Sequence, residues 1–273
     1  MATMFLRPRV VVVRSRLDLP GVAVPGVSRD IRIQIATTRS DWEQAFQLVA
    51  DNYQARGFEA GGGDYRFTTH HALPETIVLV AKEGTRVVAT LSLVPDSVQL
   101  GLPLESLYGD ELSQLRRQGR RMVETTCLAD RGLGAREFVQ VFTALMQLGW
   151  QYWNARGYRT NVITVSPRHA AFYTRLLGYQ RLGPRRAYAQ VQGAPAEAFY
   201  LDPELMQAHA PAMHQRIFGQ RLPANALNAT PMPPDLVRHF AQRSSQTSLA
   251  AVERVLRRAG GVSPLRGRER SEV

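Results

Sequence analysis

The sequence predicts an α/β (α+β) protein in which helices cover both faces of a mixed sheet. Residues 31–35 alternate apolar and polar side chains, as a half-buried strand does. Residues 76–82 and 86–94 flank a Glu-Gly-Thr turn and are therefore expected to form a hairpin. The apolar run at 161–165 leads into a short amphipathic helix that stops at a glycine. Strands and helices alternate along most of the chain, and this order predicts a sheet between two layers of helices.

Five elements are predicted in the first half of the chain. In order they are a strand at 31–35, a helix from Ser40 to near Gly57, strands at 76–82 and 86–94, and a helix at 107–117 within an insertion at 101–118. The start of the first helix is indicated by Ser40 and Glu43, which fit a capping box. The three glycines at 61–63 begin a loop that runs to Pro74.

The second half of the chain completes the predicted sheet and adds a helical tail. Its elements are a strand at 121–129, a helix at 135–156, a strand at 161–165, a short helix at 166–178, a final strand at 185–191 and helices at 202–218, 234–242 and 246–259. One domain is therefore expected over 30–200. It follows an irregular lead-in at 1–29 and precedes a helical C-terminal extension at 201–273, which ends in a basic stretch at 266–270.

The composition indicates a globular protein with a strongly basic surface. The chain has 273 residues, of which 44% are hydrophobic, and a formal charge of +11 that comes almost entirely from arginine, because Lys82 is the sole lysine. Such a surface suits a polyanion, which can be a nucleic acid, an anionic membrane or an acidic protein. Nucleic acid is not expected, because no helix-turn-helix or RNA-binding motif is present. Peripheral membrane contact remains open.

Cysteine content and hydropathy bear on the compartment. Cys127 is the sole cysteine, so an intramolecular disulfide and a Cys-rich metal site are excluded, and no metal is expected. No segment approaches the roughly 20 apolar residues that span a bilayer. The apolar run at 10–13 is too short for a signal peptide. A cytoplasmic protein is therefore predicted.

Several sequence blocks resemble one enzyme family. The blocks lie at 72–76, 89–97, 101–108, 115–124, 167–169 and 193–196. The segment from 161 to Tyr179, with Phe172-Tyr173 and Leu177-Gly178, is similar to the last block of the GNAT superfamily of N-acyltransferases. Taken together over 65–195, the blocks resemble the long-chain N-acyl amino acid synthases (FeeM-type), which are related to acyl-homoserine-lactone autoinducer synthases. The resemblance implies a GNAT fold with a mixed, mostly antiparallel sheet.

Glu124 is the predicted general base. An amine must lose a proton before it attacks a thioester, and a carboxylate on a strand beside a cleft can take that proton. Glu124 alternates with Val123 and Thr125 inside a predicted strand, where a carboxylate needs a partner or a function. The resemblance implies the catalytic role. The structural alternative is an ion pair with one of three arginines, Arg86, Arg120 or Arg121.

Tyr173 is the predicted general acid toward the departing thiolate. Its position on the short helix lets the phenol point into a cleft beside the strand, although the same residue also fits the core face of that helix. Backbone amides on the strand of Glu124 are suited to bind the thioester oxygen. The candidates for this oxyanion role are Leu128 and Ala129.

Four residues are candidates for substrate binding. Arg56 resembles the arginine-aromatic site of the relatives and suits a carboxylate. Asp96 either holds the substrate ammonium or caps a turn with Ser97. Arg168 and His169 begin the short helix and are expected to bind an anion, such as the phosphopantetheine phosphate or a carboxylate, although an exposed turn also tolerates both.

The predicted acyl donor is an acyl carrier protein. Residues 130–136 keep the small residues of a diphosphate-binding loop, but the leading Asp130 and the altered spacing argue against a coenzyme A grip. A carrier needs a basic landing surface instead. The candidates are Arg116, Arg117, Arg120 and Arg121, with a solvated helix end as the alternative. No cofactor is expected, because the phosphopantetheine thioester arrives as substrate.

The predicted function is the transfer of a long-chain acyl group from acyl carrier protein to the α-amine of an amino acid. One alternative is an autoinducer-synthase-like or acyl-CoA-dependent N-acyltransferase that acts on another amine. Autoinducer synthases carry Glu-x-x-Arg on this strand, whereas the present chain has Cys127 in place of the arginine. The other alternative is a catalytically inactive acyltransferase fold that binds nucleic acid or anionic lipid.

Overall fold

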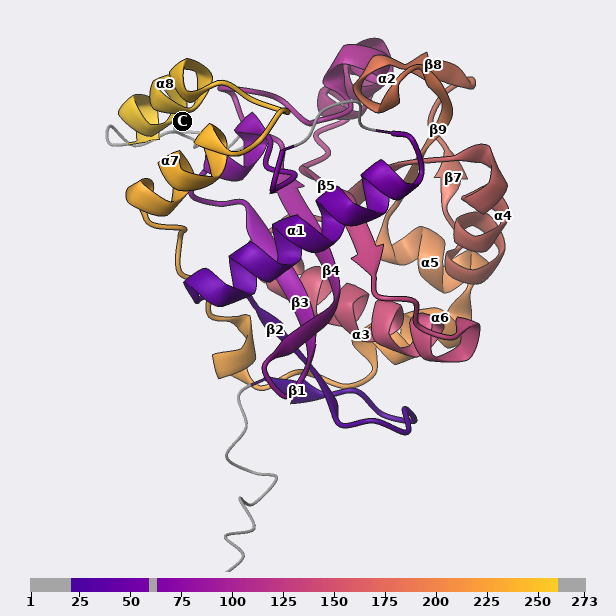
Figure 1. The fold of residues 1–273 in the computed structure, drawn as a ribbon. Helices are drawn as coiled ribbons and strands as arrows, with labels where there is room; N and C mark the ends of the chain where they lie inside the picture. Colours follow the sequence, from indigo (N-terminus) through magenta and orange to yellow (C-terminus); the bar gives the residue numbers. More distant parts are fainter. Residues whose placement is uncertain (1–20, 59–62, 260–273) are drawn as a thin grey trace, which may run out of the picture.

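The computed structural model describes residues 21–58 and 63–259 and shows a mixed sheet with helices on both faces (Figure 1). The strands are β1 (Val22–Ala23), β2 (Ile31–Ile35), β3 (Ile77–Glu83), β4 (Arg86–Pro95), β5 (Met122–Asp130), β6 (Thr160–Val165), β7 (Gln180–Arg181), β8 (Arg186–Tyr188) and β9 (Ala194–Leu201). Their order is β1-β2-β3-β4-β5-β6-β9-β7, and β8 pairs with β9. Within the described residues, β5 and β6 run parallel and all other neighbours run antiparallel. The predicted fold class is therefore confirmed.

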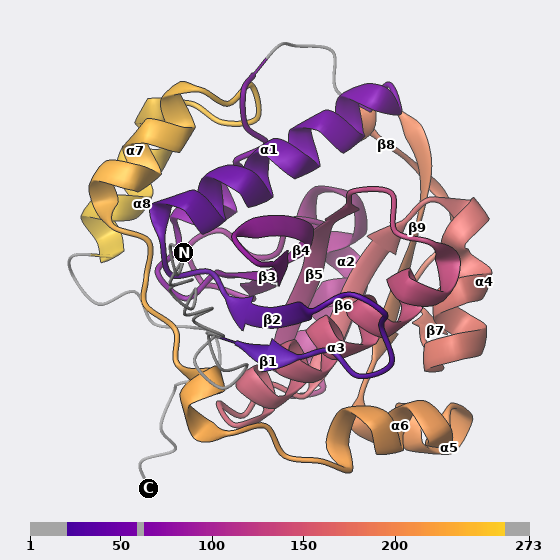
Figure 2. The same ribbon diagram turned by 60° about the horizontal axis from the view of Figure 1, so that its bottom comes forward.

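Helices cover both faces of the sheet, with α1 on one face and α3 on the other. The helices are α1 (Arg39–Ala55), α2 (Glu105–Arg117), α3 (Ala135–Asn154), α4 (Ala170–Phe172), α5 (Pro203–His209), α6 (Pro211–Phe218), α7 (Pro234–Gln242) and α8 (Leu249–Ala259). Figure 2 shows α1 and α3 on opposite faces. On β3, Val78 and Val80 pack into the α1 layer, whereas Leu79 packs into the α3 layer. Because both faces of β3 are buried, its sequence is an almost continuous apolar run.

The N-cap of the first helix lies two residues earlier than the sequence indicated. Thr38 is its N-cap, and the Thr38 side chain accepts a hydrogen bond from the backbone N–H of Asp41 at 3.2 Å. Glu43 does not complete a capping box with Ser40, because it pairs with Arg39 at 2.7 Å across one helical turn. The capping rule identified the right kind of residue in the wrong place, since Thr38 and Ser40 are both good caps.

The end of the sheet corrects the predicted final strand at 185–191. Only Arg186–Tyr188 form the short β8, and the long strand is β9, which pairs with β6 from Asn161↔Leu201 to Val165↔Glu197. The chain turns between β8 and β9 at Gln192 and Gly193, both with positive φ. Pro195 lies near the start of β9, where a strand tolerates proline.

The C-terminal extension packs against both faces of the sheet (Figures 1 and 2). The predicted helix at 202–218 is two helices, α5 and α6, because Pro211 has no N–H to continue the first one. Met206 and Ile217 of this pair are buried in the core of the α3 layer. Phe240 of α7 and Val252 of α8 are buried in the α1 layer. The helix predicted at 234–242 is confirmed, and the last helix begins at Leu249 instead of residue 246.

Two further observations concern the ends of the chain and its hydropathy. Residues 1–20 of the predicted lead-in and the basic stretch at 266–270 lie outside the described residues. Within the predicted lead-in, Val22–Ala23 pair with β2 as a short edge strand. Among the residues that the structure describes, no helix is long and apolar enough to cross a membrane.

Phe240→Ala tests whether α7 belongs to the core. The Phe240 ring is fully buried, and its centroid lies 4.9 Å from that of Phe46 and 5.8 Å from that of Phe67. Truncation should lower the free energy of unfolding by about 3–5 kcal/mol because it leaves a cavity between the rings. Urea unfolding followed by circular dichroism measures the change. The control is Leu249→Ala, at a residue 37% exposed, and equal effects of the two variants would contradict the packing.

Candidate active site

The site lies where β5 and β6 part. The two strands pair over four positions, from Met122↔Thr160 to Thr125↔Ile163. On its other side β5 carries a bulge, because Ser92 faces Thr126 whereas Thr90 faces Ala129. Cys127 lies in this bulge with a φ of 54°. A bulge bends its strand, and here β5 turns away from β6 and opens a wedge between them.

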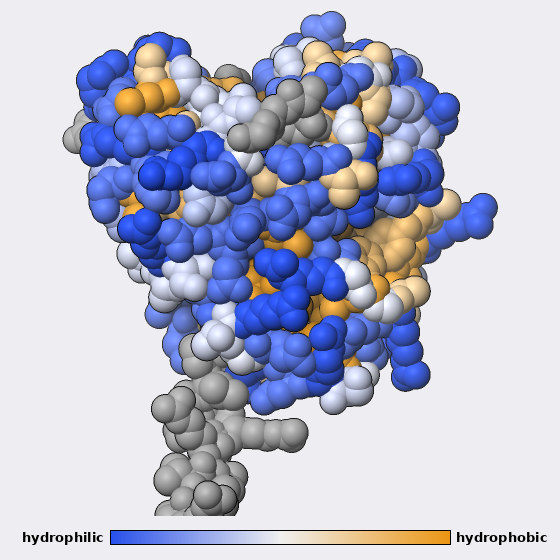
Figure 3. Space-filling model, in the orientation of Figure 1, coloured by the Kyte–Doolittle hydropathy of each residue, from blue (hydrophilic) through white to orange (hydrophobic). Residues whose placement is uncertain are grey.

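Two adjoining cavities occupy the wedge. The first, here called the Glu124 cavity, has a volume of about 300 Å³ and is lined by residues that include Tyr53, Arg66, His70, Glu124, Thr126, Cys127 and Tyr188. The second, here called the Tyr173 groove, has about 460 Å³ and is lined by residues that include Arg56, Leu128, Ala129, Phe138, Arg168, His169, Phe172 and Tyr173. Tyr53, Cys127 and Val165 line both. Figure 3 shows apolar surface between the end of α1 and the α4 segment, on the side of the groove.

Glu124 is a buried carboxyl with a raised pKa. Its side chain comes from β5, only 2% of the residue is exposed, and its Oε2 accepts a hydrogen bond from the backbone N–H of Leu104 at 2.8 Å. Burial raises the pKa of Glu124 to about 8, and the charge of Glu105 adds to the rise, while the Leu104 N–H opposes it. Glu124 is therefore a stronger base than an exposed glutamate once it is ionised.

The ion pair considered for Glu124 is not formed with the neighbouring arginines. Arg120 pairs with Asp202, and the guanidinium of Arg121 lies 4.2 Å from the centroid of the Tyr158 ring. Arg86 begins β4, whereas Val94 near the other end of that strand pairs with Glu124. The structure thus leaves Glu124 facing a cavity.

Tyr173 begins a π turn that precedes a glycine stop. The turn spans Tyr173–Leu177, and Gly178 ends it in the left-handed region with a φ of 81°. The Tyr173 ring makes edge contacts with Phe142 and Tyr179, at centroid distances of 6.0 and 5.8 Å. Burial raises the pKa of the Tyr173 phenol well above its usual value, so the hydroxyl keeps its proton. The ring is part of the core and also lines the groove, so the two interpretations of this residue are compatible.

A buried hydrogen-bond network connects the elements that hold the two residues. The Tyr179 hydroxyl donates to Oδ1 of Asn161 at 2.6 Å. The Asn161 amide donates to the carbonyl of Val123 at 3.1 Å and to the hydroxyl of Thr125 at 2.8 Å. These partners flank Glu124 on β5. The network therefore fixes β5 to β6 and to the turn of Tyr173, just before the strands part.

The other predicted site residues fall into two groups, those that line the Tyr173 groove and those that line neither cavity. Arg56, Arg168 and His169 are exposed and line the Tyr173 groove together with Leu128 and Ala129. Burial lowers the pKa of His169, and the charges of Arg168 and Arg56 lower it further. Arg56, predicted to bind the acceptor carboxylate, thus lies on the side of Tyr173 and not among the residues around Glu124. The oxyanion role of the Leu128 and Ala129 amides stays a prediction.

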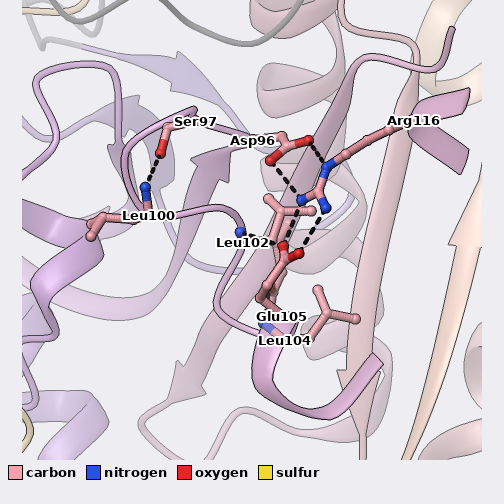
Figure 4. Close-up of polar contacts among 8 residues, drawn as sticks. Asp96, Ser97, Leu100, Leu102, Leu104, Glu105 and Arg116 are labelled. Carbon is pink, nitrogen blue, oxygen red and sulfur yellow. Dashed lines mark hydrogen bonds and ion pairs between the residues drawn. The ribbon is translucent and has the colours of Figure 1, made fainter. Parts of the chain in front are cut away.

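Asp96 and Arg116 form an ion pair that the sequence did not indicate (Figure 4). Asp96 is 2% exposed and accepts two hydrogen bonds from the Arg116 guanidinium, at 2.7 and 2.9 Å. Arg116 also bonds to both carboxylate oxygens of Glu105. Neither Asp96 nor Arg116 lines the two cavities. The substrate-ammonium role of Asp96 and the docking role of Arg116 stay predictions.

The predicted docking arginines do not form one surface beside the groove. Arg117 is exposed, but Arg120 pairs with Asp202 and Arg121 donates to the carbonyl of Arg156. All of them lie before the first residue of β5, whereas the groove is lined from Thr125 onward. The cluster in the sequence is therefore at the opposite end of β5 from the groove.

Arg66 is a site residue that the sequence analysis missed. It is 5% exposed, lines the Glu124 cavity, and its guanidinium lies 4.0 Å from the centroid of the Tyr53 ring. The segment before Pro74 has no helical or strand periodicity from which a buried arginine could be predicted. The one signal was the position of Arg66 between two aromatic residues, Tyr65 and Phe67.

No metal centre is found in the part of the chain that the structure describes. Within it, no group of three or more His, Cys, Asp or Glu side chains is placed to hold an ion. Cys127 is a buried free thiol, and burial raises its pKa. The thiol is therefore protonated, and the candidates for chemistry are the carboxyl of Glu124 and the phenol of Tyr173.

Comparison with known proteins identifies the class and then the family. The fold is similar to that of FeeM, an N-acyl amino acid synthase from uncultured soil microbes, with a TM-score of 0.58, 24% identity, and coverage of 67% of this chain and 95% of that one. It is also similar to that of the AHL synthase LasI, with a TM-score of 0.51, 14% identity, and coverage of 71% and 96%. The protein thus has the fold of these two synthases.

The family is shown by the sequence itself. The model of the FeeM family, N-acyl amino acid synthase FeeM, matches residues 44–202, which is more than half of the chain. The chain therefore belongs to the FeeM family of N-acyl amino acid synthases. A comparison with curated proteins finds no significant match.

Tyr179→Phe tests the network between the strands. Loss of the hydroxyl removes its hydrogen bond to Asn161, and the free energy of unfolding should fall by about 1–2 kcal/mol. Chemical denaturation measures the change. Tyr152→Phe is the matched control, because it keeps the ring over which Arg156 lies and should have little effect. Equal stability of the two variants would show that the network contributes nothing to the fold.

Proposed function

We propose that this protein transfers a long-chain acyl group from an acyl carrier protein to the α-amine of an amino acid. The observation that carries the proposal is the buried Glu124 carboxyl, which faces a cavity that adjoins the Tyr173 groove. Membership of the N-acyl amino acid synthase family supports the reaction class. The products are an N-acyl amino acid and the free carrier thiol.

Glu124 acts as the base. The amino acid enters the Glu124 cavity with its ammonium group beside the carboxylate, which removes one proton. The neutral nitrogen then attacks the carbonyl carbon of a thioester that lies in the groove. The raised pKa of Glu124 supports this role, because a carboxylate that binds protons more tightly deprotonates an ammonium ion more readily.

Tyr173 acts as the acid at the other side of the wedge. The attack forms a tetrahedral intermediate whose oxyanion accepts hydrogen bonds from backbone amides at the bulge, for which Leu128 and Ala129 are the candidates. The C–S bond then breaks, and the sulfur takes the proton of the Tyr173 hydroxyl. Solvent takes the extra proton on nitrogen and the proton held by Glu124, and it returns one proton to Tyr173, so the amide, a thiol and one proton in solvent remain.

Arg66 is suited to hold the carboxylate of the acceptor. It comes from the segment that covers the Glu124 cavity, and its guanidinium is oriented by the face of the Tyr53 ring. A guanidinium binds a carboxylate through two parallel hydrogen bonds, which places the amine at a fixed distance from it. An α-amino acid carries both groups on one carbon and so matches a cavity that contains Arg66 and Glu124.

A carrier protein is favoured over coenzyme A by the loop before α3. The Asp130 carboxylate accepts a hydrogen bond from the Leu133 N–H at 2.8 Å, and Asp130 lines the groove. A diphosphate at this loop would compete with that carboxylate for the amide and would be repelled by its charge. The groove is lined by exposed cations at Arg56 and Arg168, which suit an acidic carrier surface.

Mass spectrometry of lipid extracts tests the function. Cells that express the wild type should accumulate N-acyl amino acids, and cells that express Glu124→Gln should lose them, because the amide keeps the shape but cannot take a proton. The rate with purified protein should fall by about 10²–10⁴-fold. The masses identify the acyl length and the acceptor.

The purified protein separates the alternatives to this function. Thiol release from an acyl carrier thioester, and not from the matching acyl-CoA, supports the carrier donor. Turnover with acyl-CoA alone would support the coenzyme A alternative, and folded wild type without products in either assay would favour an inactive binding protein.

The pH dependence tests the state of the base. Glu124 with a pKa of about 8 holds a proton below that pH and loses it above, so kcat/KM should rise with pH and level off above about pH 8. Initial rates between pH 6 and 10 measure the profile. The residual rate of Glu124→Gln should lack this limb, and an identical limb in that variant would assign it to the substrate amine instead.

A further inference from the structure

The turn between β4 and α2 is fixed by one arginine (Figure 4). Arg116, near the end of α2, reaches back to Asp96 just after β4 and to Glu105 at the start of α2. Its Nε and Nη2 donate to Asp96 at 2.7 and 2.9 Å, and its Nη1 donates to Glu105 at 2.7 Å. The Arg116 side chain is only 15% exposed. These partly buried, multidentate contacts hold both ends of the turn.

The same turn carries the amide that binds Glu124. Leu104 directly precedes Glu105 and donates its N–H to Glu124 at 2.8 Å. The Glu105 carboxylate also accepts the N–H of Leu102 at 3.3 Å. Gly101, with a φ of 65°, leaves room for that carboxylate, since a Cβ there would lie 2.6 Å from Glu105 Oε2. Arg116, Glu105 and the Leu104 amide therefore form a continuous connection to Glu124.

The charges around Glu124 give Arg116 a second effect. On the side of β4 and α2, the charge of Glu105 acts on Glu124, and Arg116 pairs with both Glu105 and Asp96. On the cavity side the ionisable neighbours are Arg66, His70, Tyr53, Tyr188 and Cys127, and burial favours the neutral forms of the last four. Without Arg116, the Glu105 carboxylate, whose charge acts on Glu124, would lose its hydrogen bonds from this guanidinium.

We propose that Arg116 is a positioning residue for Glu124: it fixes the turn whose Leu104 amide binds the Glu124 carboxylate, and it neutralises the neighbouring Glu105 carboxylate. This inference rests on the proposed role of Glu124 as the base. It also gives Arg116 a function that does not involve a carrier protein. The expected consequence of losing Arg116 is a Glu124 that ionises at higher pH, because uncompensated like charges favour the protonated form.

Titration of Glu124 by carbon-13 NMR tests the proposal without depending on activity. The Glu124 carboxyl signal is the one absent from Glu124→Gln. In Arg116→Met the titration midpoint of the Glu124 carboxyl signal should rise by about one pH unit. Arg116→Lys, which keeps the charge, should show a smaller rise. Arg117→Met, at the exposed neighbouring position, should titrate as the wild type does. A midpoint in Arg116→Met equal to that of the wild type overturns the proposal.

Amide exchange and kinetics distinguish positioning from general stabilisation. Exchange at the Leu104 amide should accelerate in Arg116→Met, and the rising limb of kcat/KM should move to higher pH with the NMR midpoint. A lower rate with an unmoved limb would mean that Arg116 only stabilises the fold. A shifted midpoint in a protein without acyltransferase activity would uphold the positioning role and reject the function. An active enzyme with an unshifted midpoint would uphold the function and reject the positioning role.

Glu105→Gln keeps the proposal testable if Arg116→Met does not fold. Glu105 has a side chain that is 34% exposed, and glutamine keeps its shape and can still accept from Arg116. Removal of this negative charge should lower the Glu124 midpoint, in the direction opposite to the loss of Arg116. A midpoint in Glu105→Gln that rises or does not change contradicts the electrostatic part of the proposal.

Discussion

The parting of β5 from β6 is the constraint on which the rest of the site depends. The strands pair over four positions, and the bulge at Cys127 then bends β5 away. A continuous ladder here would satisfy the backbone but would leave no space between the strands. Because they diverge, their side chains line two adjoining cavities, and backbone amides at the bulge can serve a ligand. The network of Asn161 and Tyr179 marks the last point at which β5 and β6 are joined.

Burial gives the two candidate catalytic groups complementary proton affinities. Both pKa values are raised, because a low-dielectric environment disfavours the charged form of a carboxyl and of a phenol. For Glu124 the result is a better base, and for Tyr173 it is a reliably protonated donor. One physical cause thus suits the two residues to opposite tasks. The turn held by Arg116 limits the effect at Glu124, because the Leu104 amide stabilises the carboxylate.

The C-terminal extension contributes to both layers that support the site. Met206 and Ile217 complete the core beneath α3, whereas Phe240 packs with Phe46 of α1. The Tyr53 side chain, also from α1, lines both cavities. Residues far from the cavities in the sequence therefore support the helix that covers them. Gln246 of the extension also lines the Glu124 cavity itself.

The sequence alone determined the elements whose signals are local. The alternation at 31–35, the hairpin about Gly84 and the glycine stop at Gly178 are set by neighbouring residues, so the fold class and the strand of Glu124 could be predicted. The tertiary structure decided which distant residues and strands pair with one another. The pairing of Arg116 with Asp96, the burial of Arg66 and the pairing of β9 with β6 join residues that are distant in the chain. A cluster of arginines in the sequence cannot show which of its charges are neutralised, because ion pairs depend on positions that only the folded chain supplies.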